Sequence, residues 1–282
     1  IYLDNNIHKD CECAMDCDGD GIKDGEDNCP CNPLISKTTF RVVHPVFLDV
    51  FRGNQPVANW NIEEGAIDIE QTDNAQASLI YGEHKLSSVD YEGTFFVNFT
   101  KDDDYAGFVF SYQSSSLFYV AMWKRGTTPE SNDGTRPLAI GGLQIKKVQS
   151  VTGPGKELGS ALWFSGDTPG QVKLLYLDPA GAPWVPQVSF RWELIHRPKI
   201  GLIRIRFLEA NGQVVVDTGN IFDSDLLGGR VGLYVASQRN VGFKLLNYEC
   251  NELVPKEVYN SLTSSQKSLT GVDPEPASPA WL

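Results

Sequence analysis

From about Trp60 onward the chain consists of short strand-like runs, and residues 66–70 alternate between hydrophobic and polar side chains with the period of two of a β-strand. Aromatic and valine residues are common in these runs, and turns rich in glycine, proline or asparagine separate them. The runs cover residues 66–70, 93–99, 107–112, 117–123, 143–148, 172–177, 190–195, 202–208, 214–217, 231–236 and 241–246. Because no long helical periodicity is present, the pattern predicts an all-β sandwich or barrel, and about 190 residues is a normal length for one such domain.

The two ends of the chain do not share this pattern. Residues 1–31 show almost no apolar periodicity and are typical of a loop segment held together by ligands or cross-links. From Asn251 the chain is rich in serine, threonine, proline and lysine, which predicts disorder. We therefore expect an irregular segment at 1–36, a β domain at 37–252 and a disordered tail at 253–282.

The net charge of −12 makes nucleic acid an unsuitable partner, because neutralising phosphates requires a surplus of lysine and arginine. More than half of this charge lies in residues 1–31, where nine acidic side chains face two lysines. Such a segment repels itself and needs cations, cross-links or both to fold. No run of about 18 apolar residues exists, so no membrane-spanning helix is predicted.

Five of the six cysteines also lie in this segment. They are Cys11, Cys13, Cys17, Cys29 and Cys31, and the sixth is Cys250. An even number of cysteines, clustered in an acidic loop region, predicts disulfides formed in an oxidising compartment. A zinc site is the alternative. However, one residue rather than two separates the cysteines in Cys11-Glu12-Cys13 and Cys29-Pro30-Cys31, and no histidine has the spacing of a zinc finger. Asn98-Phe99-Thr100 is an N-glycosylation sequon, which agrees with secretion.

Residues 16–27 have the ligand spacing of an EF-hand calcium loop. The ligands at positions 1, 3, 5, 7, 9 and 12 of that loop correspond to Asp16, Asp18, Asp20, the Ile22 carbonyl, Asp24 and Asp27. Gly21 at position 6 permits the sharp turn. Calcium prefers six to eight hard oxygen ligands, which this pattern supplies. The alternative is an exposed acidic loop with accidental spacing. No amphipathic helix flanks the loop, so disulfides would replace the helices as its scaffold.

This loop, followed by Asn28-Cys29-Pro30, resembles the calcium-binding type 3 repeat of thrombospondins. Several later strings resemble the thrombospondin C-terminal domain. They are the strings at 93–98, 102–110, 112–116, 118–120, 152–155, 166–172, 196–199, 228–233 and 248–250. Together the matches cover roughly residues 11–250.

The resemblance implies a legume-lectin-like (concanavalin A-like) β-sandwich jelly roll, preceded by a short calcium-bound, disulfide-linked repeat. It further implies a bridge between Cys29 and Cys250, which would fasten the acidic segment to the sandwich. Cys11 and Cys17 are expected to form disulfides between repeats. Cys13 and Cys31 are additional to the pattern, and a bridge between these two is one option.

The chain also departs from the family pattern. It holds one complete calcium loop, and Arg52-Gly53-Asn54 stands nearest to an Arg-Gly-Asp motif, so integrin binding through that motif is not expected. The family's receptor-contact segments correspond to 118–124 and 203–207, which we interpret as core strands rather than accessible epitopes.

Asp102, Asp103 and Asp104 precede an apolar strand, where three adjacent carboxylates could hold one or two calcium ions in the sandwich. The alternative is a solvated turn. Asp49 matches a further acidic position of the family. A glycosidase needs two carboxylates across a cleft, and Asp68 and Glu70 form the best available pair, although a solvent-facing strand gives the same string.

These observations predict a secreted calcium-binding glycoprotein of the extracellular matrix, in which calcium has a structural role. The expected partners are matrix proteins, cell-surface receptors or glycosaminoglycans. We do not expect an enzyme; a glycan-binding lectin and a glycan-processing enzyme are the alternatives. We expect the chain to be the C-terminal piece of a longer protein that oligomerises through upstream regions.

Overall fold

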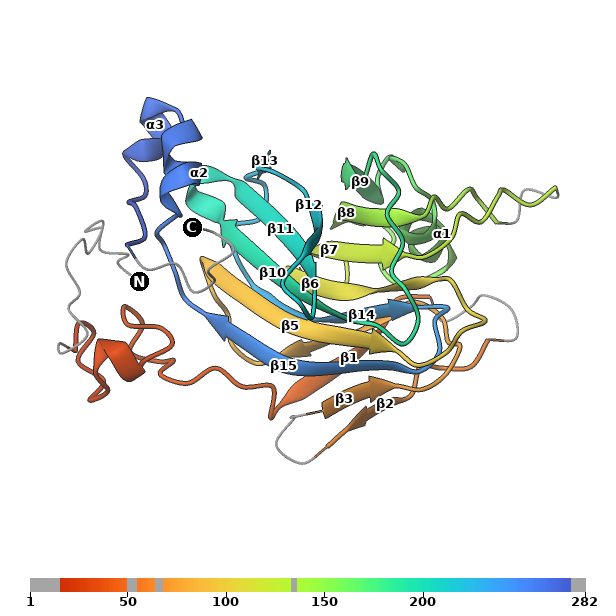
Figure 1. Cartoon of the computed structure of the whole chain (residues 1–282), viewed down its shortest axis with the longest axis horizontal. Helices are drawn as coiled ribbons and strands as arrows, with labels where there is room; N and C mark the ends of the chain where they lie inside the picture. The colour runs from red at the N-terminus through yellow and green to blue at the C-terminus, as the bar shows by residue number, and fades with distance from the viewer. Residues whose placement is uncertain (1–15, 50–54, 64–67, 133–135, 275–282) are drawn as a thin grey trace.

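The computed structural model describes residues 16–49, 55–63, 68–132 and 136–274. In this part of the chain, two antiparallel β-sheets pack face to face (Figure 1). The seven-stranded sheet has the order β1 (Val43–Phe47), β4 (Ser78–Gly82), β14 (Arg230–Ala236), β6 (Tyr105–Ser114), β7 (Leu117–Lys124), β8 (Gly142–Gln149) and β9 (Val172–Leu177). The prediction of an all-β sandwich is confirmed.

The second sheet has eight strands, seven in a continuous order and one short strand, β13, that lies outside this order. Its order is β12 (Val214–Asp217), β11 (Leu202–Glu209), β10 (Ser189–Arg197), β5 (Val89–Val97), β15 (Val241–Glu249), β3 (Asp68–Gln71) and β2 (Trp60–Ile62), and β13 (Ile221–Phe222) pairs with β11. Short helical segments are η1 (Asp24–Glu26), α1 (Lys156–Trp163), η2 (Pro198–Ile200), α2 (Lys256–Ser261) and α3 (Ser264–Lys267).

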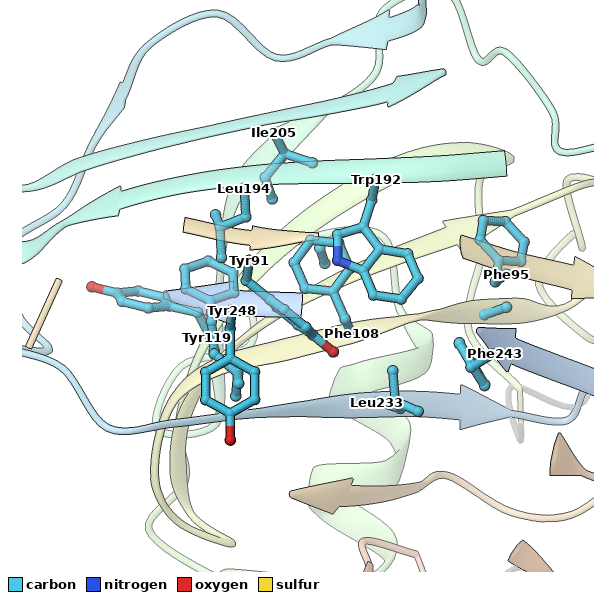
Figure 2. Packing of buried hydrophobic residues seen from close by; sticks show 14 of the residues in the cluster. Tyr91, Phe95, Phe108, Tyr119, Trp192, Leu194, Ile205, Leu233, Phe243 and Tyr248 are labelled. Atoms are coloured by element: carbon cyan, nitrogen blue, oxygen red, sulfur yellow. The ribbon is translucent and has the colours of Figure 1, made fainter. Parts of the chain in front are cut away.

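Aromatic side chains fill the space between the two sheets (Figure 2). Strand β5 alternates strictly between buried and half-buried residues, which directs Tyr91 and Phe95 into this core. The Phe108 ring stacks on Trp192 at 5.2 Å between centroids. Gly93 makes room for that tryptophan, because a Cβ atom at Gly93 would lie 2.4 Å from the Trp192 ring.

A second hydrophobic cluster covers the opposite face of the seven-stranded sheet. Leu158, Ala161 and Leu162 of α1 belong to this cluster together with side chains of β6 and β7. Strands β6 and β7 are therefore buried on both faces. The interpretation of 118–124 and 203–207 as core strands is confirmed, since their residues are all buried. Helix α1 has only eight residues and was not predicted.

The prediction of a disordered tail from residue 253 is wrong for 253–274. Helices α2 and α3 follow the last strand, and Val254, Val258 and Leu262 form a buried cluster with residues of β10, η2 and β11. Thr263 and Gln266 form a capping box at the start of α3. Val258 lies in α2, and Val254 and Leu262 lie just before and just after that helix, so three buried side chains anchor a segment whose composition is otherwise polar. Residues 275–282 lie outside the described part.

Candidate calcium loop and its junction with the sandwich

The structure brings three of the predicted calcium ligands together. Carboxylate oxygens of Asp16, Asp18 and Asp20 lie within 4.8 Å of one another. The backbone N–H groups of Gly19 and Gly21 donate to the Asp16 carboxylate at 2.7 and 3.0 Å. Gly19 and Gly21 have φ angles of +76° and +94°, which glycine adopts without strain. These two glycines let the backbone fold tightly around the acidic side chains.

Asp27 lies at the other end of the loop and is only 9% exposed. The Cys29 N–H donates to its Oδ1 atom at 2.7 Å. Burial raises the pKa of the Asp27 carboxyl, and the charges of Asp20, Asp18 and Asp24 raise this pKa further although the Cys29 hydrogen bond lowers it. Asp27 therefore shares the electrostatic environment of the other loop carboxylates.

Asp24 and Ile22, the other two predicted ligand positions, form hydrogen bonds within the loop. The Asp24 carboxylate accepts hydrogen bonds from the Cys17 N–H and the Cys17 thiol, both at 2.9 Å. The Ile22 N–H donates to Asp20 at 2.7 Å, and the Ile22 side chain is half-buried. Asp24 thus ties the start of the loop to η1.

These residues fit a calcium ion. Within the described part of the chain, the Oδ2 atoms of Asp18 and Asp27 are buried and have no hydrogen-bond partner. Burying an ionised carboxylate oxygen without a partner is unfavourable, and a bound cation removes that penalty. Hard carboxylate oxygens in a glycine-containing loop are the ligands that calcium prefers.

A disulfide joins the loop to the end of the sandwich. Cys29 and Cys250, which are 221 residues apart in the sequence, form this bridge. The bridge confirms the pairing implied by the resemblance. Beside it, the Cys250 N–H donates to the Asn28 carbonyl at 2.8 Å, and the Thr38 hydroxyl donates to the Tyr248 carbonyl. Cys29 is fully buried, so the junction is part of the hydrophobic core rather than a surface clip.

The other cysteine pairings stay predictions. Cys11 and Cys13 lie outside the described residues, so the structure does not place them. Cys17 is half-buried within the loop, and Cys31 is exposed.

The aspartates at 102–104 contact side chains and backbone of other segments. Lys124, which is fully buried, lies 2.5 Å from Asp104 and 3.5 Å from Asp103. The Asp102 carboxylate accepts hydrogen bonds from the Asn74 amide and the Arg239 N–H, each at 3.3 Å. The charge beside this cluster is therefore a lysine of β7, a long-range contact that the sequence did not reveal. A calcium site at these three residues stays a prediction.

Burial raises the pKa of the Asp104 carboxyl to about 6, although the Lys124 ammonium opposes this rise. Asp49 is also buried. Both carboxylates line a pocket of about 460 Å³ on the outer side of the seven-stranded sheet. Sequence reasoning missed this pocket, because its walls come from segments far apart in the chain.

Asp68 and Glu70 do not lie in that pocket. They occupy alternate positions of β3, and the Lys244 ammonium donates to Asp68 at 2.9 Å. Asn98 is exposed at the end of β5, where the sequon is accessible to solvent. Among the described residues, no helix is long and apolar enough to cross a membrane.

Fold and site together define a class: a two-sheet antiparallel β-sandwich with an acidic loop fastened to it by a disulfide. The sequence profile of the thrombospondin C-terminal region matches residues 55–252. The chain belongs to this family.

Known relatives show the same affiliation. The chain is 47% identical to chicken (Gallus gallus) thrombospondin-2 over 227 residues, which cover 80% of this chain and 19% of that protein. It is 44% identical to human thrombospondin-3 over 82% of this chain and 24% of that protein. It is 43% identical to bovine (Bos taurus) cartilage oligomeric matrix protein over 81% of this chain and 30% of that protein. The chain thus spans less than a third of the length of these relatives.

Among solved structures, a carbohydrate-binding module from Bacillus subtilis matches with a TM-score of 0.44 and 12% identity, covering 72% of this chain and 99% of that chain. Peanut lectin matches with a TM-score of 0.37 and 13% identity, covering 73% and 94%. These similarities concern the general sandwich fold alone.

Proposed function

We propose that this chain is the C-terminal adhesive module of a secreted, calcium-binding matrix glycoprotein, and that calcium has a structural role in it. The observation that carries the proposal is the pair of buried, unpartnered oxygens of Asp18 and Asp27 among the described loop residues. Membership of the thrombospondin family and the matrix protein among the named relatives support the extracellular setting.

Calcium, when bound, supplies positive charge that neutralises the loop. Asp16, Asp18, Asp20 and Asp27 would hold it with their carboxylates, the Ile22 carbonyl would add an uncharged oxygen, and Asp24 would serve directly or through water. Gly19 and Gly21 hold the backbone in the tight turn that this arrangement needs. Neutralisation makes the ordered loop more stable than the self-repelling one, so binding and folding are coupled.

We propose that the loop unit extends from residue 1 to 36 and that the sandwich unit begins at 37. The Asn28 N–H donates to the Ser36 carbonyl at 3.1 Å, which closes the loop segment at this point. The α2–α3 extension at 253–274 belongs to the sandwich unit, because Val254, Val258 and Leu262 pack on it, although the family profile ends at residue 252.

The proposed partners are matrix proteins, cell-surface receptors or glycosaminoglycans, and we infer no catalytic activity. Asp68 is paired with Lys244 on the open side of a sheet, which does not resemble two carboxylates across a cleft. We further propose that Asn98 carries an N-linked glycan, because its side chain is exposed. Glycosidase release followed by mass spectrometry checks this assignment.

The central experiment compares Asp27→Asn with Glu26→Gln. Both variants remove one negative charge from the same loop, but the exposed Glu26 is not at a ligand position. We expect calorimetric calcium titration to show weaker or absent binding at this site in Asp27→Asn and unchanged binding in Glu26→Gln. Adhesion of cells to a surface coated with Asp27→Asn should fall, and adhesion to Glu26→Gln should equal that to the parent chain. Equal calcium binding by the two variants would contradict the proposal.

A further inference from the structure

The pocket on the seven-stranded sheet lies away from the calcium loop. Tyr105 and Tyr234 of neighbouring strands β6 and β14 line it, and Gly159 and Trp163 of α1 line it from the other side. In Figure 1, α1 lies toward the end of the sandwich opposite the N-terminal segment. A volume of about 460 Å³ is within the range of small-molecule sites.

Two hydrogen-bond donors in this pocket are buried and lack a partner in the described part of the chain. Tyr234 is fully buried, and its hydroxyl has no partner. The Nε1 atom of Trp163 is also buried without one. Buried polar groups in native proteins are nearly always hydrogen-bonded, so two orphaned donors lining one pocket indicate a ligand that accepts hydrogen bonds there.

Acceptors line the same pocket. The Asp49 side chain is 5% exposed, and Asp104 is mostly buried. Arg136 contributes a positive charge, but it is an exposed residue. Donors, carboxylate acceptors and aromatic side chains in one pocket suit a ligand whose groups both accept and donate hydrogen bonds, which is the property of a hydroxyl group.

The walls of the pocket are held rigidly. The Tyr105 hydroxyl donates to the Trp163 carbonyl at 3.0 Å, and the two rings pack edge to face with centroids 5.6 Å apart. The Gly155 N–H at the start of α1 donates to the Leu48 carbonyl at 2.8 Å, next to Asp49. At Gly159 a Cβ atom would lie 2.2 Å from the Asp49 carboxylate, so the absence of a side chain sets the distance between helix and carboxylate.

We propose that this pocket binds a neutral sugar residue, the terminal hexose of a glycan. The aromatic rings provide apolar surface for the C–H faces of the sugar, the two carboxylates accept from its hydroxyl groups, and Tyr234 and Trp163 donate to its oxygens. An anionic sugar is disfavoured, because its charge would meet the buried Asp49 carboxylate. The site is separate from the calcium loop, so it adds a glycan ligand to the adhesive function proposed above.

Saturation-transfer NMR tests the proposal with the methyl glycosides of mannose, glucose, galactose and N-acetylglucosamine, each at millimolar concentration in calcium-containing buffer. We expect at least one of them to bind. Tyr234→Phe, which removes only the hydroxyl, should weaken that binding about five- to tenfold. The matched control is Tyr176→Phe on β9, which loses a hydroxyl outside the pocket and should bind like the parent chain.

A folding defect is distinguishable from the loss of a ligand contact. Since the Tyr234 hydroxyl has no partner within the described protein, Tyr234→Phe should not lower the melting temperature. Asp49→Asn should also weaken hexose binding, and the methyl glycoside of glucuronic acid should bind more weakly than the hexose. The proposal is overturned if none of the hexosides binds, if Tyr234→Phe and Tyr176→Phe bind equally well, or if the glucuronide binds as tightly as the hexose.

Discussion

Opening the Cys29–Cys250 disulfide should strongly destabilise the sandwich. The bridge closes a ring over a sequence separation of 221 residues. In the chain-entropy description, a ring of this length lowers the entropy of the unfolded chain enough to stabilise the fold by about 5 kcal/mol at 25 °C. Domains of ordinary stability unfold with about 5–15 kcal/mol, so the bridge is a large part of the total.

The perturbation is Cys29→Ala with Cys250→Ala, compared with each single substitution. Urea unfolding in saturating calcium, followed by the fluorescence of buried tryptophans such as Trp123 and Trp192, gives the free energy of unfolding. Each single variant loses the bridge, so we expect all three variants to lose about the same free energy. Effects of the two single variants that add in the double variant would show that side-chain packing, not the ring, is the source.

A loss of less than about 1 kcal/mol would refute the entropic reasoning for this bridge. It would mean that the hydrogen bonds beside the disulfide, from Cys250 N–H to Asn28 and from Thr38 to Tyr248, hold the junction without it. The acidic loop would then be attached to the sandwich by non-covalent contacts alone.

Three further changes should have measurable effects. Burial, together with the nearby Arg197 charge, lowers the pKa of His196 in the folded protein to about 3. In the unfolded chain this histidine binds a proton as the pH falls below about 6.5, so the free energy of unfolding decreases from there toward pH 3. Urea unfolding at several pH values should show that His196→Gln removes up to about 2–3 kcal/mol of this loss between about pH 6.5 and 4.5; parallel curves would contradict it. Val258→Ala should cost about 1–2 kcal/mol by thermal melting, whereas the same change at the exposed Val151 should cost almost nothing. Gly93→Ala should be strongly destabilising in the same assay, because the new methyl group overlaps the Trp192 ring; a melting temperature equal to that of the parent would contradict this packing.

The strands and the clustering of Asp16, Asp18 and Asp20 were predictable because both depend on local sequence. The run at 93–99 was recognised by its aromatic and valine content, and β5 covers Val89–Val97. The aspartates of the loop follow from ligand spacing, which is also local. The Cys29–Cys250 pairing was different, because spacing left many pairings open and the resemblance to a family selected one.

What the sequence did not reveal depends on contacts between distant segments. Lys124 reads as one residue of an apolar strand, and nothing local shows that it meets Asp104 in the core. Helix α1 is too short for its periodicity to be recognised, and its burial depends on the sheet beneath it. The tail at 253–274 has a polar composition, so the three apolar residues that anchor it carry little weight in any average.

Hydrogen exchange with and without a calcium chelator tests the structural role of calcium most directly. With calcium bound, amides of residues 16–36 should be protected, and chelation should increase their exchange while the central strands β5, β6 and β7 stay protected. Asp27→Asn in calcium should resemble the chelated protein, and Glu26→Gln should resemble the calcium-bound one. Exchange of residues 16–36 that is the same with and without the chelator would contradict a structural calcium ion in this loop.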